Sequence, residues 1–231
     1  MQLNRVNRID DLVPVRRALV SVADKTGLEE FVEGLVRIVP DITIYSTGGT
    51  YHQIRETLGP DRAACAVQVS EYTGQPELQG GLVKTLDYKI YLGLLSETYN
   101  DSHRADLSRT GSVPIDLVVV NLYPFREAVS VEGATLEDAR THIDIGGPCM
   151  LRASAKNFLR VGSVCSPEDY PALLAELERE HGALSFRTRF ELAKKAFAHT
   201  ARYDARIAEY LSAVNAETAV QPYTFQGGHS R

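Results

Sequence analysis

The sequence predicts an α/β fold in three layers, with a mainly parallel sheet between two layers of helices. Short apolar segments alternate with segments that repeat apolar residues at helical spacing through the first 165 residues, as in consecutive strand–helix units. The segment Ile115–Leu122 is almost continuously apolar, which is typical of a strand covered on both faces in a parallel sheet.

The first half of the chain supplies three expected strands. Ala18–Val22 is a short apolar run, and Thr26 with Glu29 has the spacing of a capping box that would open the first helix. A second strand at Ile42–Tyr45 leads into a glycine-containing turn and a second helix. A third strand is expected near Ala66–Val69.

Residues 70–112 are less regular, with one strand or helix expected at Lys89–Leu95. The remaining expected elements are the strand at 115–122, helices at 135–141, 146–157, 166–180 and 185–214, and a last strand at 161–165. We therefore divide the chain into an N-terminal extension (1–16), a core (17–165), C-terminal helices (166–214) and a flexible tail (215–231) without helical periodicity.

The composition excludes several classes of function. Lys and Arg number 25 against 30 Asp and Glu, and a net charge of −5 argues against general binding to nucleic acids or anionic membranes. Cys65, Cys149 and Cys165 form no CxxC pair, so neither a zinc ribbon nor a disulfide framework is indicated. With no signal peptide or long apolar run in view, we expect a cytoplasmic protein without a metal centre.

Two turns of similar composition follow the first two expected strands. Residues 23–27 and 46–50 each combine glycine and hydroxyl residues with a helix start, and Lys25 adds a positive charge. Free N–H groups at such a helix start suit a phosphate. Either turn alone would be an ordinary capped turn, but two on neighbouring strands favour a phosphate site. Neither has the spacing of a Walker A or GxGxxG motif, so a nucleoside triphosphate or NAD is not indicated.

Further polar residues lie at expected strand ends, where parallel sheets bind their ligands. Lys84 follows two adjacent glycines, and a snorkelling surface lysine is the alternative. Tyr123 ends the most apolar strand and could equally pack at the sheet edge. Asp144 precedes a helix, where any carboxylate is stabilised.

Two helices carry other polar residues at regular spacing. Arg152 and Lys156 share one face of their helix, which has no acidic residue. His199 and Tyr203 share one face of the final long helix, and we interpret them as packing residues rather than catalytic ones.

Seven motifs occur in order along the chain. They are Ser21–Leu28, Ser46–Thr50, Val83–Leu86, Val120–Phe125, Ile143–Pro148, Arg152–Asn157 and Phe197–Asp204. Together they resemble the inosine monophosphate (IMP) cyclohydrolase domain of the bifunctional purine-biosynthesis enzyme, over about Arg17–Ala213.

The resemblance implies a methylglyoxal-synthase-like fold, a homodimer, and closure of the last purine ring. In that reaction 5-formamidoimidazole-4-carboxamide ribotide loses water and becomes IMP, without a cofactor. It leaves open whether a separate formyltransferase works with this chain.

The resemblance also assigns residues to roles. Asp144 would handle the amide nitrogen, Lys156 and Tyr123 would stabilise or protonate the formyl oxygen, and Lys84 would assist. The residues implied to bind substrate are Lys25, Thr26, Thr47, Gly49 and Thr50 at the ribose phosphate, and Thr85 and the Gly146 backbone at the base.

The sequence departs from the family pattern at several positions. Ala23 stands where the family usually has serine, and Leu82 where it has arginine. Asp87 and Tyr88 replace a His-Pro pair, and Tyr91 replaces a histidine. We therefore expect a cation to be lost and a carboxylate gained beside Lys84, which would weaken binding of an anionic ribotide.

Two alternatives follow from these features. A non-catalytic nucleotide-binding regulatory domain, or a paralogue with an altered substrate, is favoured by the changes at 82–91. The four expected catalytic residues favour an enzyme. Methylglyoxal synthase itself fits less well, because the motifs at 121–125 and 143–147 are those of the cyclohydrolase.

Overall fold

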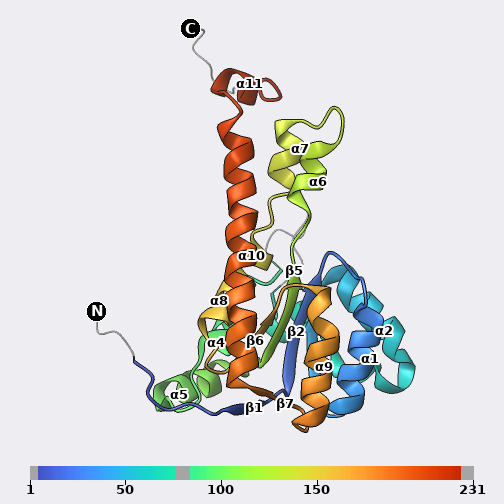
Figure 1. Ribbon diagram of the computed structural model, residues 1–231, viewed down its shortest axis with the longest axis vertical. Coiled ribbons are helices and arrows are strands. Elements are labelled where there is room, and N and C mark those ends of the chain that lie inside the picture. The colour runs from blue at the N-terminus through green and yellow to red at the C-terminus, as the bar shows by residue number, and fades with distance from the viewer. Residues whose placement is uncertain (1–4, 76–83, 225–231) are drawn as a thin grey trace.

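The computed structural model describes residues 5–75 and 84–224. Its centre is a parallel sheet of five strands in the order β4-β3-β2-β5-β6, so the expected α/β fold is confirmed (Figure 1). These strands are Arg17–Val22 (β2), Thr43–Ser46 (β3), Ala66–Gln68 (β4), Leu117–Asn121 (β5) and Gly162–Val164 (β6). In register, Val22 lies opposite Asn121 and Val20 opposite Ser46. The carboxyl ends of β2, β3 and β5 therefore meet at one edge of the sheet.

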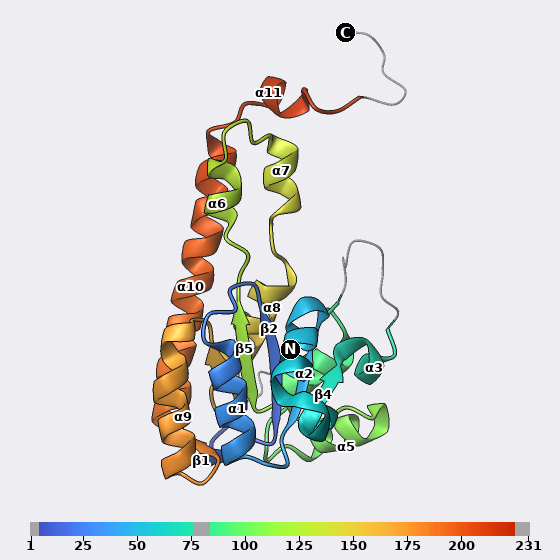
Figure 2. The same ribbon diagram turned by 90° about the vertical axis from the view of Figure 1, so that its right-hand side faces the viewer.

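Helices cover both faces of this sheet, as the three-layer prediction requires (Figures 1 and 2). One face packs against α1 (Leu28–Ile38), α2 (Gly48–Arg62) and α9 (Tyr170–Arg179). The opposite face packs against α3 (Val69–Thr73), α4 (Tyr88–Leu95), α8 (Gly146–Lys156) and α10 (Phe186–Ser212). All five residues of β5 are buried, because alternate side chains enter the two apolar layers.

The less regular sequence before β5 is helical where it is described. Lys89–Leu95, expected as a strand or a helix, lies in α4, and α5 covers Asp101–Thr110. Asp87 and Asn100 supply the N-cap side chains of these two helices. Short 3₁₀ turns at Ala63–Cys65 and Pro167–Asp169 precede β4 and α9.

The first helix begins differently from the expected capping box. Gly27 precedes α1 in a left-handed conformation, with φ of 66°, and no side chain caps the helix. Thr26 instead donates its hydroxyl to Asp24 over 2.6 Å, and its backbone N–H reaches the same carboxylate oxygen. The local Asp24 carboxylate thus competes for the group that the sequence pattern assigned to the cap.

The N-terminal extension joins the core through a small second sheet. Strand β1 (Leu12–Pro14) pairs antiparallel with β7 (Ala183–Ser185). Arg189 is completely buried beside this pair and donates hydrogen bonds to five backbone carbonyl groups. They belong to Asp10, Asp11, Phe158, Leu159 and Leu184. One side chain therefore ties the extension to the start of α10 and to the segment after α8.

An arm extends beyond the carboxyl end of β5 (Figure 2). It consists of α6 (Phe125–Ser130) and α7 (Leu136–Thr141), which lie beside the C-terminal half of α10. The expected helix at 135–141 is α7, and Thr135 and Asp138 form its capping box. None of the helices in the described residues is long and apolar enough to span a membrane.

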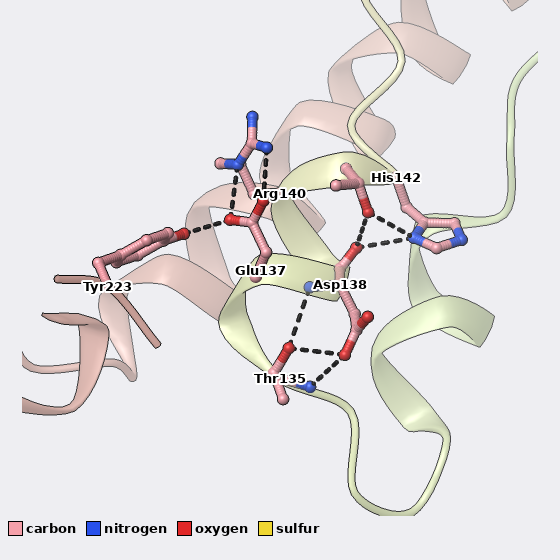
Figure 3. Close-up of polar contacts among 7 residues, drawn as sticks. Thr135, Glu137, Asp138, Arg140, His142 and Tyr223 are labelled. Atoms are coloured by element: carbon pink, nitrogen blue, oxygen red, sulfur yellow. Dashed lines mark hydrogen bonds and ion pairs between the residues drawn. The ribbon is translucent and has the colours of Figure 1, made fainter. Parts of the chain in front are cut away.

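The expected tail contains one further helix. Residues Ala216–Val220 form α11, where the Asn215 side chain accepts a hydrogen bond from the backbone of Thr218. After α11, the Tyr223 hydroxyl donates to Glu137 of α7, which also pairs with Arg140 (Figure 3). Part of a segment that lacks helical periodicity is therefore helical, and the Asn215 cap stabilises the start of this helix.

A buried ion pair connects the start of the central strands to the segment after α8. Arg160 donates to Asp116 over 2.9 Å, and their side chains are only 7% and 9% exposed. The second Asp116 carboxylate oxygen accepts the backbone N–H groups of Arg16 and Arg17. Because the Asp116 carboxylate is buried, removal of the Arg160 guanidinium would leave an unpaired charge inside the protein.

We expect Arg160→Ala to lower the free energy of unfolding by about 3–5 kcal/mol, because it leaves the buried Asp116 carboxylate without its ion-pair partner. The matched control is Arg37→Ala, whose partner Glu178 lies on the surface, with both side chains more than 60% exposed. That change should cost less than about 1 kcal/mol. Denaturant titration measures both, and equal losses would contradict the assignment.

Candidate functional site

A cleft opens at the edge where β2, β3 and β5 end, which is also where the strand order reverses. Ligands of open α/β sheets bind at this place. The cleft has a volume of about 560 Å³, within the range of small-molecule sites. Its lining includes nine of the eleven expected site residues: Lys25, Thr47, Gly49, Thr50, Lys84, Thr85, Tyr123, Asp144 and Gly146.

Asn121, the last residue of β5, fixes the turn after β2. Its side-chain oxygen accepts the backbone N–H groups of Ala23 and Asp24 over 2.6 and 2.9 Å. Its side-chain nitrogen donates to the Asp24 carbonyl over 2.7 Å. Three hydrogen bonds from one buried amide therefore hold the backbone that presents Lys25 to the cleft.

The turn after β3 is anchored to β2 by hydroxyl groups. Thr50 accepts the Val22 N–H and donates to the Val22 carbonyl, and the hydroxyls of Thr47 and Ser21 lie 3.1 Å apart. The Thr50 hydroxyl thus serves the backbone, while Thr47 lies nearer the opening. Together they place the start of α2 at the floor of the cleft.

Two lysine side chains converge on the same turn. Gly48 adopts a φ of 49°, and a Cβ there would stand 3.3 Å from the Lys84 ammonium nitrogen. A Cβ on Gly49 would stand 4.0 Å from that of Lys25. Glycine lets both ammonium groups approach the backbone at the start of α2. Two cations beside a helix N-terminus are an arrangement that suits a phosphate group.

Asp144 lies across the cleft, at the start of α8. Its carboxylate accepts the Gly147 N–H over 3.0 Å. A Cβ on Gly147 would stand 2.5 Å from the other carboxylate oxygen and 2.6 Å from Leu122. Glycine is therefore required at position 147, since a side chain there would displace the Asp144 carboxylate.

Burial raises the pKa of the Asp144 carboxyl above its ordinary value. Backbone N–H groups of Gly147, Tyr123 and Gly146 act in the opposite direction and lower it. The carboxyl is therefore a stronger base than an exposed aspartate while remaining hydrogen-bonded. A carboxyl with a raised pKa in a cleft is a candidate for proton transfer.

Three more expected residues complete this end of the cleft. Thr85 is buried, and a Cβ on Gly146 would stand 3.0 Å from the Thr85 hydroxyl oxygen. Tyr123 lines the cleft with its side chain 60% exposed, so it does not pack at the sheet edge. Thr85, Tyr123 and Gly146 thus line the same cleft as Asp144.

Two expected site residues are not part of the cleft lining. Thr26 is exposed and bonded to Asp24, as described above. Lys156 is the last residue of α8, about 15 Å along the helix axis from Gly146 at 1.5 Å per residue. Within one chain, Lys156 is therefore separated from the carboxylate of Asp144.

The extra carboxylate that was expected beside Lys84 does not line the cleft. Asp87 caps α4 by accepting the Lys89 N–H over 2.8 Å and does not line the cleft. Tyr91 packs in the apolar layer under α8, and Tyr88 is exposed. Leu82 lies outside the described residues. Ala23 does line the cleft, so the absent serine hydroxyl is a change within the site.

Sequence reasoning did not identify two residues of this region. Asn121 was part of a motif, but its role depends on the approach of β2 and β5 in space. His142 lines the cleft beside Asp144 and appeared isolated in the sequence. Within residues 5–75 and 84–224, no three His, Cys, Asp or Glu side chains come together as a metal ion would require.

Two family models match the chain in consecutive segments. Residues 27–149 match the MGS-like domain, and residues 154–230 match the AICARFT/IMPCHase bienzyme family. The first match includes the cleft residues from Thr47 to Gly147, and the second includes Lys156 and all of α10.

The chain is also similar to curated proteins and to a solved structure. The bifunctional purine biosynthesis protein PurH of Neisseria gonorrhoeae is 46% identical over 87% of this chain, and that of Xylella fastidiosa is 48% identical over 89%. The chain spans 37% of the length of each. The crystal structure of ForH is 32% identical, with a TM-score of 0.71 over 86% of this chain and 97% of that one. The chain therefore belongs to the MGS-like domain family, as the counterpart of the IMP cyclohydrolase portion of PurH.

Proposed function

We propose that the chain catalyses closure of the purine ring, converting 5-formamidoimidazole-4-carboxamide ribotide and releasing IMP and water. The observation that carries this proposal is the arrangement of one cleft. Two lysines lie at the start of α2, and the half-buried carboxylate of Asp144 lies opposite them. The similarity to PurH supports the same activity.

The phosphate end of the substrate fits the turn at the start of α2. The N–H groups of its first helical turn, with Lys25 and Lys84, supply donors and positive charge for a ribose phosphate. With the phosphate bound there, the imidazole carboxamide part of the substrate would point toward Asp144, on the far side of the cleft. Binding energy at the phosphate can then hold the reacting groups in a productive conformation.

The chemistry requires one new bond between the carboxamide nitrogen and the formyl carbon. Asp144 accepts the proton that the nitrogen loses as this bond forms. The formyl oxygen gains negative charge, and the hydroxyl of Tyr123, which lines the cleft, offers a donor for it. This oxygen then takes up two protons, the one held by Asp144 and one released by the formamido nitrogen, and leaves as water. The carbon–nitrogen double bond of the new ring forms in this step.

Incubation with the formylated ribotide tests the proposal directly. We expect an absorbance change from IMP formation, without added metal, folate or nucleotide and unchanged by EDTA. Lys84→Ala should lower kcat/KM about 10–100-fold, because it removes one of the two cations that hold the phosphate. Lys194→Ala, an exposed lysine of α10 paired with Glu191, should leave the rate unchanged. Absence of turnover in the unmodified protein would refute the activity.

Asp144 makes a prediction about pH. Because its pKa is raised and its ionised form is the base, kcat/KM should fall as the pH drops, with a midpoint above about 4. Asp144→Asn should remove most of the activity.

The same carboxyl affects the stability of the protein. Because its pKa is raised by folding, its ionisation lowers the free energy of unfolding above this raised pKa and has no effect below the pKa of an ordinary aspartate. The melting temperature of the variant relative to wild type should therefore be higher at pH 7 than at pH 3. An acid limb below the ordinary aspartate range would contradict the assignment.

The position of Lys156 bears on the assembly. Its resemblance-based role needs its ammonium group at the reacting oxygen, yet α8 carries it away from the cleft of its own chain. The role of Lys156 and its distance from its own cleft agree if the protein is a homodimer in which Lys156 reaches the cleft of the partner subunit. A cytoplasmic location and a formyl transfer that supplies the substrate complete this proposal.

Mixed dimers separate the possibilities for Lys156. We expect Asp144→Asn and Lys156→Ala to be inactive alone but to recover about a quarter of wild-type activity when co-expressed in equal amounts. Half of such dimers are mixed, and each mixed dimer holds one intact site. No recovery would place Lys156 in its own chain's site, and full activity of Lys156→Ala alone would remove it from catalysis.

A further inference from the structure

The segment that carries Asp144 has little secondary structure of its own. Helix α7 ends at Thr141 and α8 begins at Gly146, so the four residues between them follow neither helix. The carboxylate is held at its far end by the Gly147 N–H. Something must also fix the backbone of Asp144 itself, because a catalytic base displaced by 1 Å can lose about 10²-fold in rate.

Tyr203 of α10 supplies this contact. Its hydroxyl oxygen accepts the backbone N–H of Asp144 over 2.7 Å. The same hydroxyl donates to the carbonyl of His142 in a longer contact of 3.4 Å. One side chain, distant in sequence, thus bonds to the peptide groups on both sides of Ile143. It satisfies two backbone polar groups of the connecting segment.

The Tyr203 ring is itself fixed by packing. It is only 6% exposed and lies in the apolar layer between α8, α10 and the sheet. Its ring meets Phe125 edge-on, with centroids 6.5 Å apart. Phe125 follows the Tyr123 segment, so this packing places the hydroxyl relative to both sides of the cleft. A side chain locked on a 27-residue helix is a rigid support for a short connecting segment.

We infer that Tyr203 is a positioning residue for the reaction, which holds the Asp144 backbone so that its carboxylate faces the substrate. This inference rests on the function proposed above. It revises the interpretation of Tyr203 as a packing residue, because the packing of its ring places a hydroxyl group on the segment that carries the catalytic carboxylate. Tyr203 acts through Asp144 and does not itself line the cleft.

Tyr203→Phe removes the hydroxyl and keeps the ring. We expect kcat to fall at least about tenfold with KM changed less than threefold, since the base is misplaced while the phosphate end is intact. Tyr210→Phe is the matched control. Tyr210 lies on the same helix and its ring also meets Phe125, but its hydroxyl makes no hydrogen bond to any residue that the structure describes. This control should retain wild-type kinetics.

A double variant distinguishes positioning from a general loss of structure. If Tyr203 acts through Asp144, adding Tyr203→Phe to Asp144→Asn should change the residual rate less than twofold, because the base is already absent. The same fractional loss in both backgrounds would overturn the inference. An unchanged kcat in Tyr203→Phe alone would also overturn it.

Amide hydrogen exchange provides a readout that does not depend on turnover. Tyr203→Phe should accelerate exchange at the Asp144 amide, whereas Tyr210→Phe should not. Unchanged protection would refute the contact even in an active enzyme. If the wild-type protein shows no ring closure while the Asp144 amide loses protection in Tyr203→Phe, the proposed function fails and the positional role of Tyr203 stands.

Discussion

The parallel pairing of β2 with β5 at the centre of the sheet is the constraint on which the site depends. It brings Val22 opposite Asn121, so the Asn121 side chain can bind the turn that carries Lys25. The pairing of β2 with β3 adds the Thr47–Thr50 turn at the same edge. Because both apolar layers bury β5 completely, this edge is a rigid base for polar loops.

Electrostatics divide the cleft into two ends. Lys25 and Lys84 gather at the start of α2, where helix N–H groups add to their positive field. Asp144 lies at the start of α8, where burial favours its protonated form and backbone donors favour the charged one. The proposed ribotide would bind with its phosphate at the lysine end, and its reacting groups would then lie beside the Asp144 carboxyl, whose pKa is raised. The chain's net negative charge does not oppose this, because the cations are local.

The sequence was informative wherever a pattern is local. The apolar run at 115–122 predicted β5, and the two similar turns after β2 and β3 both line the cleft. Three-residue strands such as β1 and β7 were not predictable, since their pairing depends on contacts made far along the chain. The Thr26 cap failed because Asp24 competes for the same hydroxyl. Helical spacing placed Tyr203 on a packing face, but it could not show which backbone its hydroxyl would reach.

A crystal structure with IMP bound would locate both ends of the ligand in the cleft at once. We expect the phosphate on the Thr47–Thr50 turn within hydrogen-bond distance of Lys25 and Lys84, and the closed ring beside Asp144 and Tyr123. A phosphate bound elsewhere, or a ring turned away from the Asp144 carboxylate, would contradict this expectation.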